Sequence, residues 1–161
     1  MSLKIQDYKQ MTYPYKLLLE GNADAHSQLY SVVETFKDEH LSYKNPDVKS
    51  RTCGEIISHT VCTQSCFFTN SLVLGKKEKC ECKVPASIDD ALKMIQGNLM
   101  NMSKTWQDIS VEELETEITT EWGQIMSKEL ALFQSIEHFM YHVGELCFLA
   151  GMGGFYQGTL G

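Results

Sequence analysis

The stretch Ser135-Ile136-Glu137-His138-Phe139-Met140-Tyr141-His142-Val143-Gly144-Glu145-Leu146 has no proline and is dense in apolar residues. It predicts a helix over about residues 127–150. Residues four apart on an α-helix lie one above the other, so His138 and His142 share a face. Two imidazoles placed in this way can hold one metal ion. Because this helix is apolar nearly all round, we expect it at the centre of a bundle or against another subunit.

Three further segments repeat apolar residues with helical spacing, at about residues 15–38, 52–74 and 87–106. Thr52 and Glu55 form a capping-box pattern at the start of the second, and Ser87 is placed to cap the third. No strand pattern competes with these helices, although residues 107–123 are acidic and hard to assign. The sequence therefore predicts an all-α four-helix bundle, formed by a single domain over residues 1–161.

Composition limits the classes of partner. The formal net charge of -7 argues against nucleic acid and against an anionic membrane surface as partners. Residues 1–7 contain no long apolar core, so we expect no signal peptide, and no apolar run is long enough to span a bilayer. These features favour a cytoplasmic protein with no nucleic-acid and no membrane partner.

The chain has six cysteines, for which a reducing cytoplasm predicts free thiols. Cys62 and Cys66 fall in the second helix, where we expect them to pack in the core, although either could approach a metal as a soft ligand. Cys80-Glu81-Cys82 lies in a connector rich in lysine, which favours thiolate and makes redox or metal chemistry conceivable. We expect an ordinary surface loop there, because Cys-x-Cys alone lacks the ligands of a zinc site.

A useful metal site needs a third ligand beside His138 and His142. We expect His26 and His40 at the surface or at helix ends, whereas His59 lies in the second helix among apolar residues that face the core. Trp106 and Trp122 are expected to pack the ends of the bundle or its interface. His59 is therefore the candidate that geometry has to test.

Heights along the bundle decide whether His59 reaches the pair. At 1.5 Å per residue, His59, His142 and His138 lie roughly 10, 12 and 18 Å from one end if the second and fourth helices are antiparallel. If the two helices were parallel, His59 and His142 would be more than about 10 Å apart. A metal site therefore requires the order up-down-down-up, with a long crossover between the second and third helices. The connector at residues 75–86 could reach about 40 Å when extended, which is enough.

Two blocks of the chain resemble a known family. They are Arg51-Thr52-Cys53-Gly54-Glu55-Ile56-Ile57-Ser58-His59 and His138-x-x-x-His142-x-Gly144-Glu145-Leu146, and they are similar to blocks of the DinB/YfiT-like superfamily of small metal-binding four-helix bundles. The resemblance implies an up-down-down-up bundle, a homodimer, and a divalent metal, zinc or nickel, on His59, His138 and His142. Some members are transferases that join low-molecular-weight thiols such as bacillithiol to electrophiles, some are mycothiol-dependent isomerases, and many have no assigned activity.

One difference from the family pattern adds a carboxylate. Where the family often has His-Arg-Gly-Gln, this chain has His142-Val143-Gly144-Glu145. Glu145 shares a helix face with His138 and His142. It would serve as a fourth ligand, as a general base, or as an acceptor that orients a histidine ring, unless it is only a partly solvated carboxylate.

Three hypotheses about function follow. The first is a metal-dependent enzyme, a thiol-dependent S-transferase or a related hydrolase or transferase, whose ion activates a water or a small-molecule thiol toward an electrophile. The second is a bundle that binds a metal or a small ligand without catalysis, for sensing, stress response or dimer assembly. The third is a bundle without metal, which predicts that His59 lies far from His138 and His142.

Overall fold

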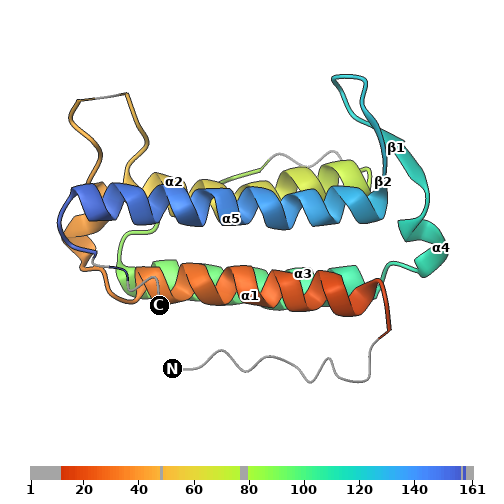
Figure 1. The fold of residues 1–161 in the computed structure, drawn as a ribbon, viewed down its shortest axis with the longest axis horizontal. Helices are drawn as coiled ribbons and strands as arrows, with labels where there is room; N and C mark the ends of the chain where they lie inside the picture. Colours follow the sequence, from red (N-terminus) through yellow and green to blue (C-terminus); the bar gives the residue numbers. More distant parts are fainter. Residues whose placement is uncertain (1–11, 48, 77–79, 157, 159–161) are drawn as a thin grey trace.

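The computed structural model describes residues 12–47, 49–76, 80–156 and 158. The opening segment at residues 1–7 and the middle of the connector at residues 77–79 lie outside this range. Long helices form two layers (Figure 1), with one pair below and one pair above. The lower pair is α1 (Tyr15–Val33) and α3 (Ile88–Gln107), and the upper pair is α5 (Lys128–Met152) and α2 (Cys53–Cys62), which continues into η3 (Thr63–Val73).

The helices follow the order up-down-down-up, as predicted. In Figure 1, α1 and α5 run in one direction, while α2 with η3 and α3 run in the other. The chain after η3 returns along the length of the bundle before α3 begins, which is the long crossover. The helices α2 and α5 are thus antiparallel and packed against each other, as the histidine heights required.

Side chains at the helix starts explain where the helices begin. Thr52 Oγ1 accepts from the Glu55 backbone N–H at 3.2 Å, while the Thr52 N–H donates to Glu55 Oε2 at 2.7 Å. This is the capping box that the sequence indicates. Ser87 Oγ caps α3 and Ser127 Oγ caps α5 in the same manner. The prediction for the first helix was too long, since α1 ends at Val33 and a short 3-10 helix, η2 (Asp38–Ser42), follows.

The second helix has the predicted length but not the predicted regularity. After Cys62 the α-helix becomes a π-helix, η3, in which each turn holds more residues. The bond from the Leu74 N–H to the Thr69 carbonyl, 3.0 Å long, spans five residues and closes its last turn. Apolar spacing alone could not distinguish this from an ordinary α-helix.

Residues 107–123, which were hard to assign, contain a short helix and, together with the residues up to 127, a hairpin. The helix α4 (Val111–Leu114) leads into the antiparallel strands β1 (Glu117–Thr119) and β2 (Ile125–Ser127). Gly123 turns the chain between them with φ of +83°, a conformation that favours glycine. Trp122 lies at this turn and is 60% exposed, whereas Trp106 is fully buried and donates from Nε1 to Thr69 Oγ1. The expectation of no strands was therefore wrong here.

The expectation of free thiols is wrong for four of the six cysteines. Cys62 is bonded to Cys82 and Cys66 to Cys80, while Cys53 and Cys147 are free. Cys62 and Cys66 are half-buried rather than core residues, and Cys80 and Cys82 do not form a plain surface loop. The physical reason is the path of the crossover, which runs back along η3 and α2 and brings the two pairs together.

The structure also corrects the placement of His26. It is fully buried, not at the surface, and its ring packs against Phe139 with centroids 4.4 Å apart. Its Nδ1–H donates to the Asn22 carbonyl at 2.8 Å, and its Nε2 accepts from Asn98 Nδ2 at 3.0 Å. Gln64 links the same cluster by donating to Asn22 Oδ1 and accepting from Asn98 Nδ2. We refer to Asn22, His26, Gln64 and Asn98 as the core polar network.

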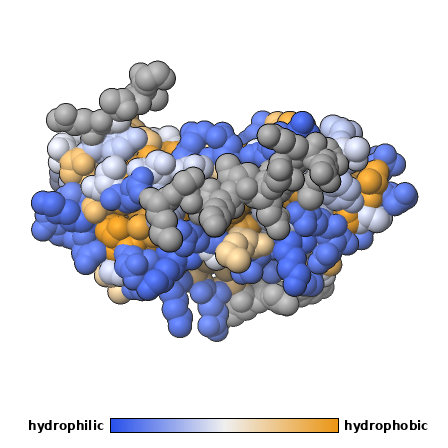
Figure 2. Space-filling model, turned by 90° about the horizontal axis from the view of Figure 1, so that it is seen from below, coloured by the Kyte–Doolittle hydropathy of each residue, from blue (hydrophilic) through white to orange (hydrophobic). Residues whose placement is uncertain are grey.

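The outer surface is mostly hydrophilic, with separate apolar areas. Figure 2 shows one such face, on which hydrophilic residues surround smaller hydrophobic patches. Several large apolar side chains of α5 are exposed, namely Leu130, Phe133, Tyr141, Phe148 and Met152. Among the described helices, none combines the length and the apolar character needed to cross a bilayer.

Candidate metal centre

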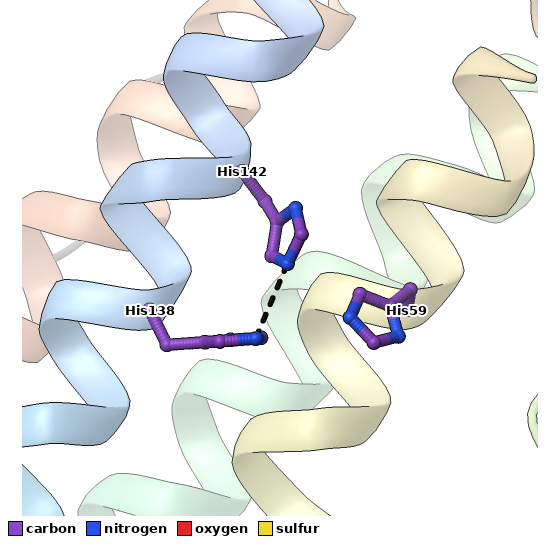
Figure 3. Close-up of side chains that lie close together, drawn as sticks. All are labelled: His59, His138 and His142. Atoms are coloured by element: carbon purple, nitrogen blue, oxygen red, sulfur yellow. Dashed lines mark hydrogen bonds between the residues drawn. The ribbon is translucent and has the colours of Figure 1, made fainter. Parts of the chain in front are cut away.

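The three predicted histidines meet between α2 and α5. His59 projects from α2, while His138 and His142 project from successive turns of α5 toward it (Figure 3). The ring centroid of His59 lies 4.7 Å from that of His142 and 5.5 Å from that of His138. One ring nitrogen from each residue lies within 4.8 Å of the other two. This contradicts the third hypothesis, which placed His59 far away.

The spacing of the nitrogens fits a shared ion. His138 Nε2 and His142 Nε2 are 3.2 Å apart, as the dashed line in Figure 3 marks. Two imidazoles bound tetrahedrally at about 2.0–2.1 Å have nitrogens roughly 3.3 Å apart. A donor set of three imidazoles also suits zinc and nickel. The residues present therefore fit the divalent metal that the family resemblance implies.

Glu145 determines how the His142 ring is presented. Its Oε2 lies 2.6 Å from His142 Nδ1, and a carboxylate only accepts, so His142 Nδ1 carries the proton. The Nε2 lone pair of His142 therefore points toward His138. Glu145 contacts the nitrogen that faces away from the cluster, which supports the orienting role among those expected for it.

The other two rings are held less directly. His59 Nδ1 lies 3.3 Å from Thr63 Oγ1, one turn further along the same helix. His138 Nδ1 is buried without a hydrogen-bond partner in the described part of the chain. The His138 ring instead packs against Phe68, with centroids 5.6 Å apart. Its orientation thus depends on packing.

Burial keeps the His59 and His138 imidazoles neutral. Burial, together with the neighbouring His142, His59 and Arg51, lowers the pKa of His138 to about 4. Burial also lowers the pKa of His59, with Arg51 and His142 adding to the effect and Glu145 opposing it. Neutral imidazole is the form that binds a metal, so His59 and His138 are ready to act as ligands at neutral pH.

Sequence reasoning did not assign a role to Arg51 or to a set of aromatic residues near the site. Arg51 precedes His59 by eight residues, and its charge acts on both His59 and His138. Phe68 packs on His138, Phe67 packs on Phe68, and Trp122 stacks on Phe67 with centroids 6.0 Å apart. These aromatic rings connect the histidines to the hairpin. The only sign of this aromatic set in the sequence was the Phe67-Phe68 pair, which was assigned to the apolar face of the second helix.

Other candidates lie elsewhere. Glu55 serves the helix cap, as expected, and does not contact His59 through any hydrogen bond found in the described residues. His26 belongs to the core polar network, and His40 stacks on Phe155 with centroids 3.9 Å apart. The structure thus brings together the three histidines that the sequence selected and separates the two that it set aside.

Comparison with known proteins identifies solved structures that have the same architecture. Two solved structures share the fold with a TM-score of 0.69: a DinB-like protein from Bacillus cereus, 21% identical, and a DinB-like protein from Bacillus subtilis, 16% identical. The first comparison covers 85% of this chain and 91% of the other, and the second covers 88% and 94%. At these identities the likeness concerns the fold.

A third solved structure has an activity in its name. It is a mycothiol-dependent maleylpyruvate isomerase, with a TM-score of 0.62 and 13% identity, and the match covers 83% of this chain and 60% of that one. Among curated proteins, none matches the sequence. The sequence profile of the DinB family, however, matches residues 8–156, nearly the whole chain. This chain therefore belongs to the DinB family.

Proposed function

We propose that this protein is a metal-dependent transferase that uses a low-molecular-weight thiol, or a closely related metal-activated hydrolase or transferase. The observation that carries the proposal is the convergence of three imidazoles, two of them with Nε2 atoms 3.2 Å apart, around a point between α2 and α5. His59, His138 and His142 would bind one divalent ion, zinc or nickel. Membership of the DinB family and the shared fold with a thiol-dependent isomerase support this choice.

A bound ion and the residues around it would make different contributions to the reaction. When bound, a divalent ion lowers the pKa of a coordinated water or thiol and so supplies a nucleophile at neutral pH. Glu145 accepts the Nδ1 proton of His142 and holds that ring in one tautomer. Phe68 packs against His138 and shields one side of that ring from water, and Arg51 supplies a positive charge near His59 and His138. That charge would attract an anionic co-substrate.

The reaction we propose joins sulfur to carbon. The thiol gives up its proton to solvent, and its sulfur forms a bond to an electrophilic carbon. The group displaced from that carbon leaves with the electron pair of the broken bond. With water in place of the thiol, the same sequence is a hydrolysis. The substrate would thus be a small electrophile with a good leaving group.

A bundle that binds metal without catalysis is the alternative. Such a site needs a closed ligand shell, which Glu145 would have to complete. Glu145 instead contacts the Nδ1 of His142, away from the converging nitrogens. Three protein ligands leave positions for water, thiol or substrate, which favours the enzyme.

The proposal includes a homodimer and a cytoplasmic location. A groove of about 290 Å³ lies beside exposed apolar side chains of α5 and the start of α1, including Leu17, Leu130 and Phe133. A second copy of the chain would cover this surface by a two-fold contact between the same helices. Light scattering should show a dimer that Phe133→Glu dissociates. Low-molecular-weight thiols are kept reduced in the cytoplasm, where cell fractionation should find the protein.

Metal analysis is the direct test of the function. The purified wild-type chain should carry about one zinc or nickel ion at the histidines. The triple variant His59→Ala, His138→Ala, His142→Ala should lose this ion, whereas His40→Ala should keep it. Thermal-shift screening of thiols and electrophiles with and without metal then identifies the substrates, because only metal-loaded protein should respond. An unchanged metal content in the triple variant would end the proposal.

A further inference from the structure

Four cysteine sulfurs form one cluster on the outer side of the second helix. Cys62 and Cys66 project from α2 and η3, and they are bonded to Cys82 and Cys80 of the crossover. The two bridges also touch, since Cys80 Sγ and Cys82 Sγ are 3.0 Å apart. The Sγ atoms of Cys62, Cys80 and Cys82 all lie within 4.8 Å of one another. The sulfurs therefore belong to one site.

Contacts other than the sulfurs hold the crossover in register. Ser58 Oγ donates to the Lys83 carbonyl at 3.0 Å, one turn before Cys62 on the helix. Further along, the Val84 side chain packs over Gly54, where an added Cβ would come within 2.9 Å of it. Residues 80–84 thus run alongside residues 54–66 in the opposite direction. This register would keep the four sulfurs close together after both bridges are reduced.

The residues supply the ligands that a thiolate metal site needs. A helical pair four residues apart and a Cys-x-Cys pair together give four sulfurs, which is the ligand count of a structural zinc site. Thiolate sulfur is a soft donor that selects zinc over magnesium or calcium. The sequence places lysines at 76, 77, 79 and 83, whose charge favours thiolate over thiol. Cys62, Cys66 and Cys80 are half-buried and Cys82 is exposed, so an ion can enter.

We propose that Cys62, Cys66, Cys80 and Cys82, once reduced, bind one zinc ion as four thiolates, and that the two disulfides are the oxidised, metal-free form of the same site. Reduction takes four electrons and four protons from two molecules of a dithiol reductant, each of which becomes its own disulfide. Binding of Zn²⁺ then releases the four thiol protons to solvent. In a reducing compartment the crossover would be tied to the helix by metal, and under oxidation by disulfides.

This site is separate from the three histidines. None of its four residues is shared with them, although Cys62 follows His59 by three positions on the same helix. On the proposed function, the histidines would hold their ion in either state of the cysteines. The number of bound ions should therefore depend on the redox state at the cysteines alone.

The test measures bound zinc in the full-length chain under both redox conditions. Oxidised wild type should bind about one zinc ion, and protein reduced anaerobically with dithiothreitol, then freed of it, about two. Cys80→Ser/Cys82→Ser should bind about one in both conditions, and Cys147→Ser should match wild type. The triple histidine variant should bind none when oxidised and about one when reduced. Zinc binding at the cysteines can therefore be measured even if the proposed function of the histidines is wrong.

A second measurement uses wild-type protein alone. Zinc should protect Cys62, Cys66, Cys80 and Cys82 of the reduced chain from alkylation, while Cys147 still reacts, as peptide mass spectrometry can show. Cobalt in place of zinc should give sulfur-to-metal charge-transfer absorption that disappears on oxidation. Equal zinc binding by the reduced and oxidised chain, or equal alkylation of the four cysteines with and without zinc, would overturn the proposal.

Discussion

The bundle contains two clusters of polar side chains, and they differ in how completely their hydrogen bonds are satisfied. In the core polar network, both ring nitrogens of His26 have partners, at 2.8 and 3.0 Å. In the histidine cluster, His138 Nδ1 is buried without one in the described residues, and its Nε2 faces another Nε2. Both clusters lie between helices, and both contain histidines that burial keeps neutral.

The difference shows how a protein separates structural from functional polar groups. The core polar network uses nearly all its donors and acceptors internally, with Asn22 Nδ2 as the exception, so it fixes the packing of α1, η3 and α3. In the histidine cluster the 3.2 Å contact between the two Nε2 atoms needs a proton from one ring, which a bound cation would replace, and His138 Nδ1 has no partner in the described residues. Removing a residue should therefore affect stability at the first cluster and ligand binding at the second.

The largest expected effect is on metal binding at the histidines. His59→Ala should weaken metal binding by about 100- to 1,000-fold, because zinc sites with four ligands are worth about 10–16 kcal/mol, or roughly 2.5–4 kcal/mol per ligand. The unfolding free energy of the metal-free protein should change by less than about 1 kcal/mol, since His59 is only half-buried. Competition titration on the oxidised chain measures the affinity, with His40→Ala as the control. A large loss of metal-free stability would show that the cluster is structural.

The reverse outcome is expected at the core polar network. Gln64→Leu removes the partner of Asn22 Oδ1 and one partner of Asn98 Nδ2, both buried. The unfolding free energy should fall by about 3 kcal/mol, since each buried polar group left unsatisfied costs about 1–3 kcal/mol. Urea denaturation measures this, and Ser71→Ala, exposed on the same π-helix, should change little. Metal affinity should stay within about threefold of wild type; a larger change would mean that the two clusters are coupled.

A smaller effect tests the orienting role of Glu145. Glu145→Gln keeps the size of the side chain but weakens its bond to His142 Nδ1. Metal affinity should fall about 10- to 100-fold, as for other residues that orient ligand histidines. Glu137→Gln, on the exposed side of the same helix, should leave the affinity unchanged. If Glu145→Gln lost as much affinity as His59→Ala, Glu145 would have to be a ligand itself.

The smallest effect is on the pH dependence of stability. Burial lowers the pKa of His26 to about 4, from an ordinary value near 6.5. Below about pH 6.5 the unfolded chain binds the proton more readily, so the stability present above that pH is lost as the pH falls toward 4. Between about pH 7 and 5.5, metal-free wild type should lose about 1 kcal/mol more than His26→Gln. Urea titrations at the two pH values measure this. Equal losses in both proteins would show that His26 can be protonated in place.

Local signals and the family resemblance predicted most of the fold and the meeting of His59, His138 and His142. Apolar spacing marked the four long helices, and the capping residues Thr52 and Ser87 marked two of their starts to within one residue. Helix rise allowed His59 to reach His138 and His142 only in the order up-down-down-up, and the family resemblance implied the same order and the same three histidines. These inferences worked because they depend on spacing within one segment and on the fixed geometry of helices.

What could not be predicted depends on contacts between segments distant in sequence. The satisfaction of the buried His26 ring depends on Asn98 of α3, which in turn is held by Gln64 of η3. The pairing of Cys62 with Cys82 depends on the path of the crossover, which has no periodic signal. The hairpin at residues 117–127 has strands of three residues each, which are too short for alternation to be recognised.

The π-helix has a consequence for how this chain can vary. A π-turn accommodates an extra residue within a continuous rod, and the side chains after it are rotated relative to an uninterrupted α-helix by about 100° per residue gained. Gln64 reaches the interior and Phe67 reaches the hairpin from within this segment. Deleting one residue between Thr63 and Val73 would therefore rotate every later side chain of this helix about the helix axis. The helix itself would remain continuous. Length changes in relatives, which usually fall in loops, are thus to be sought here in the middle of a helix.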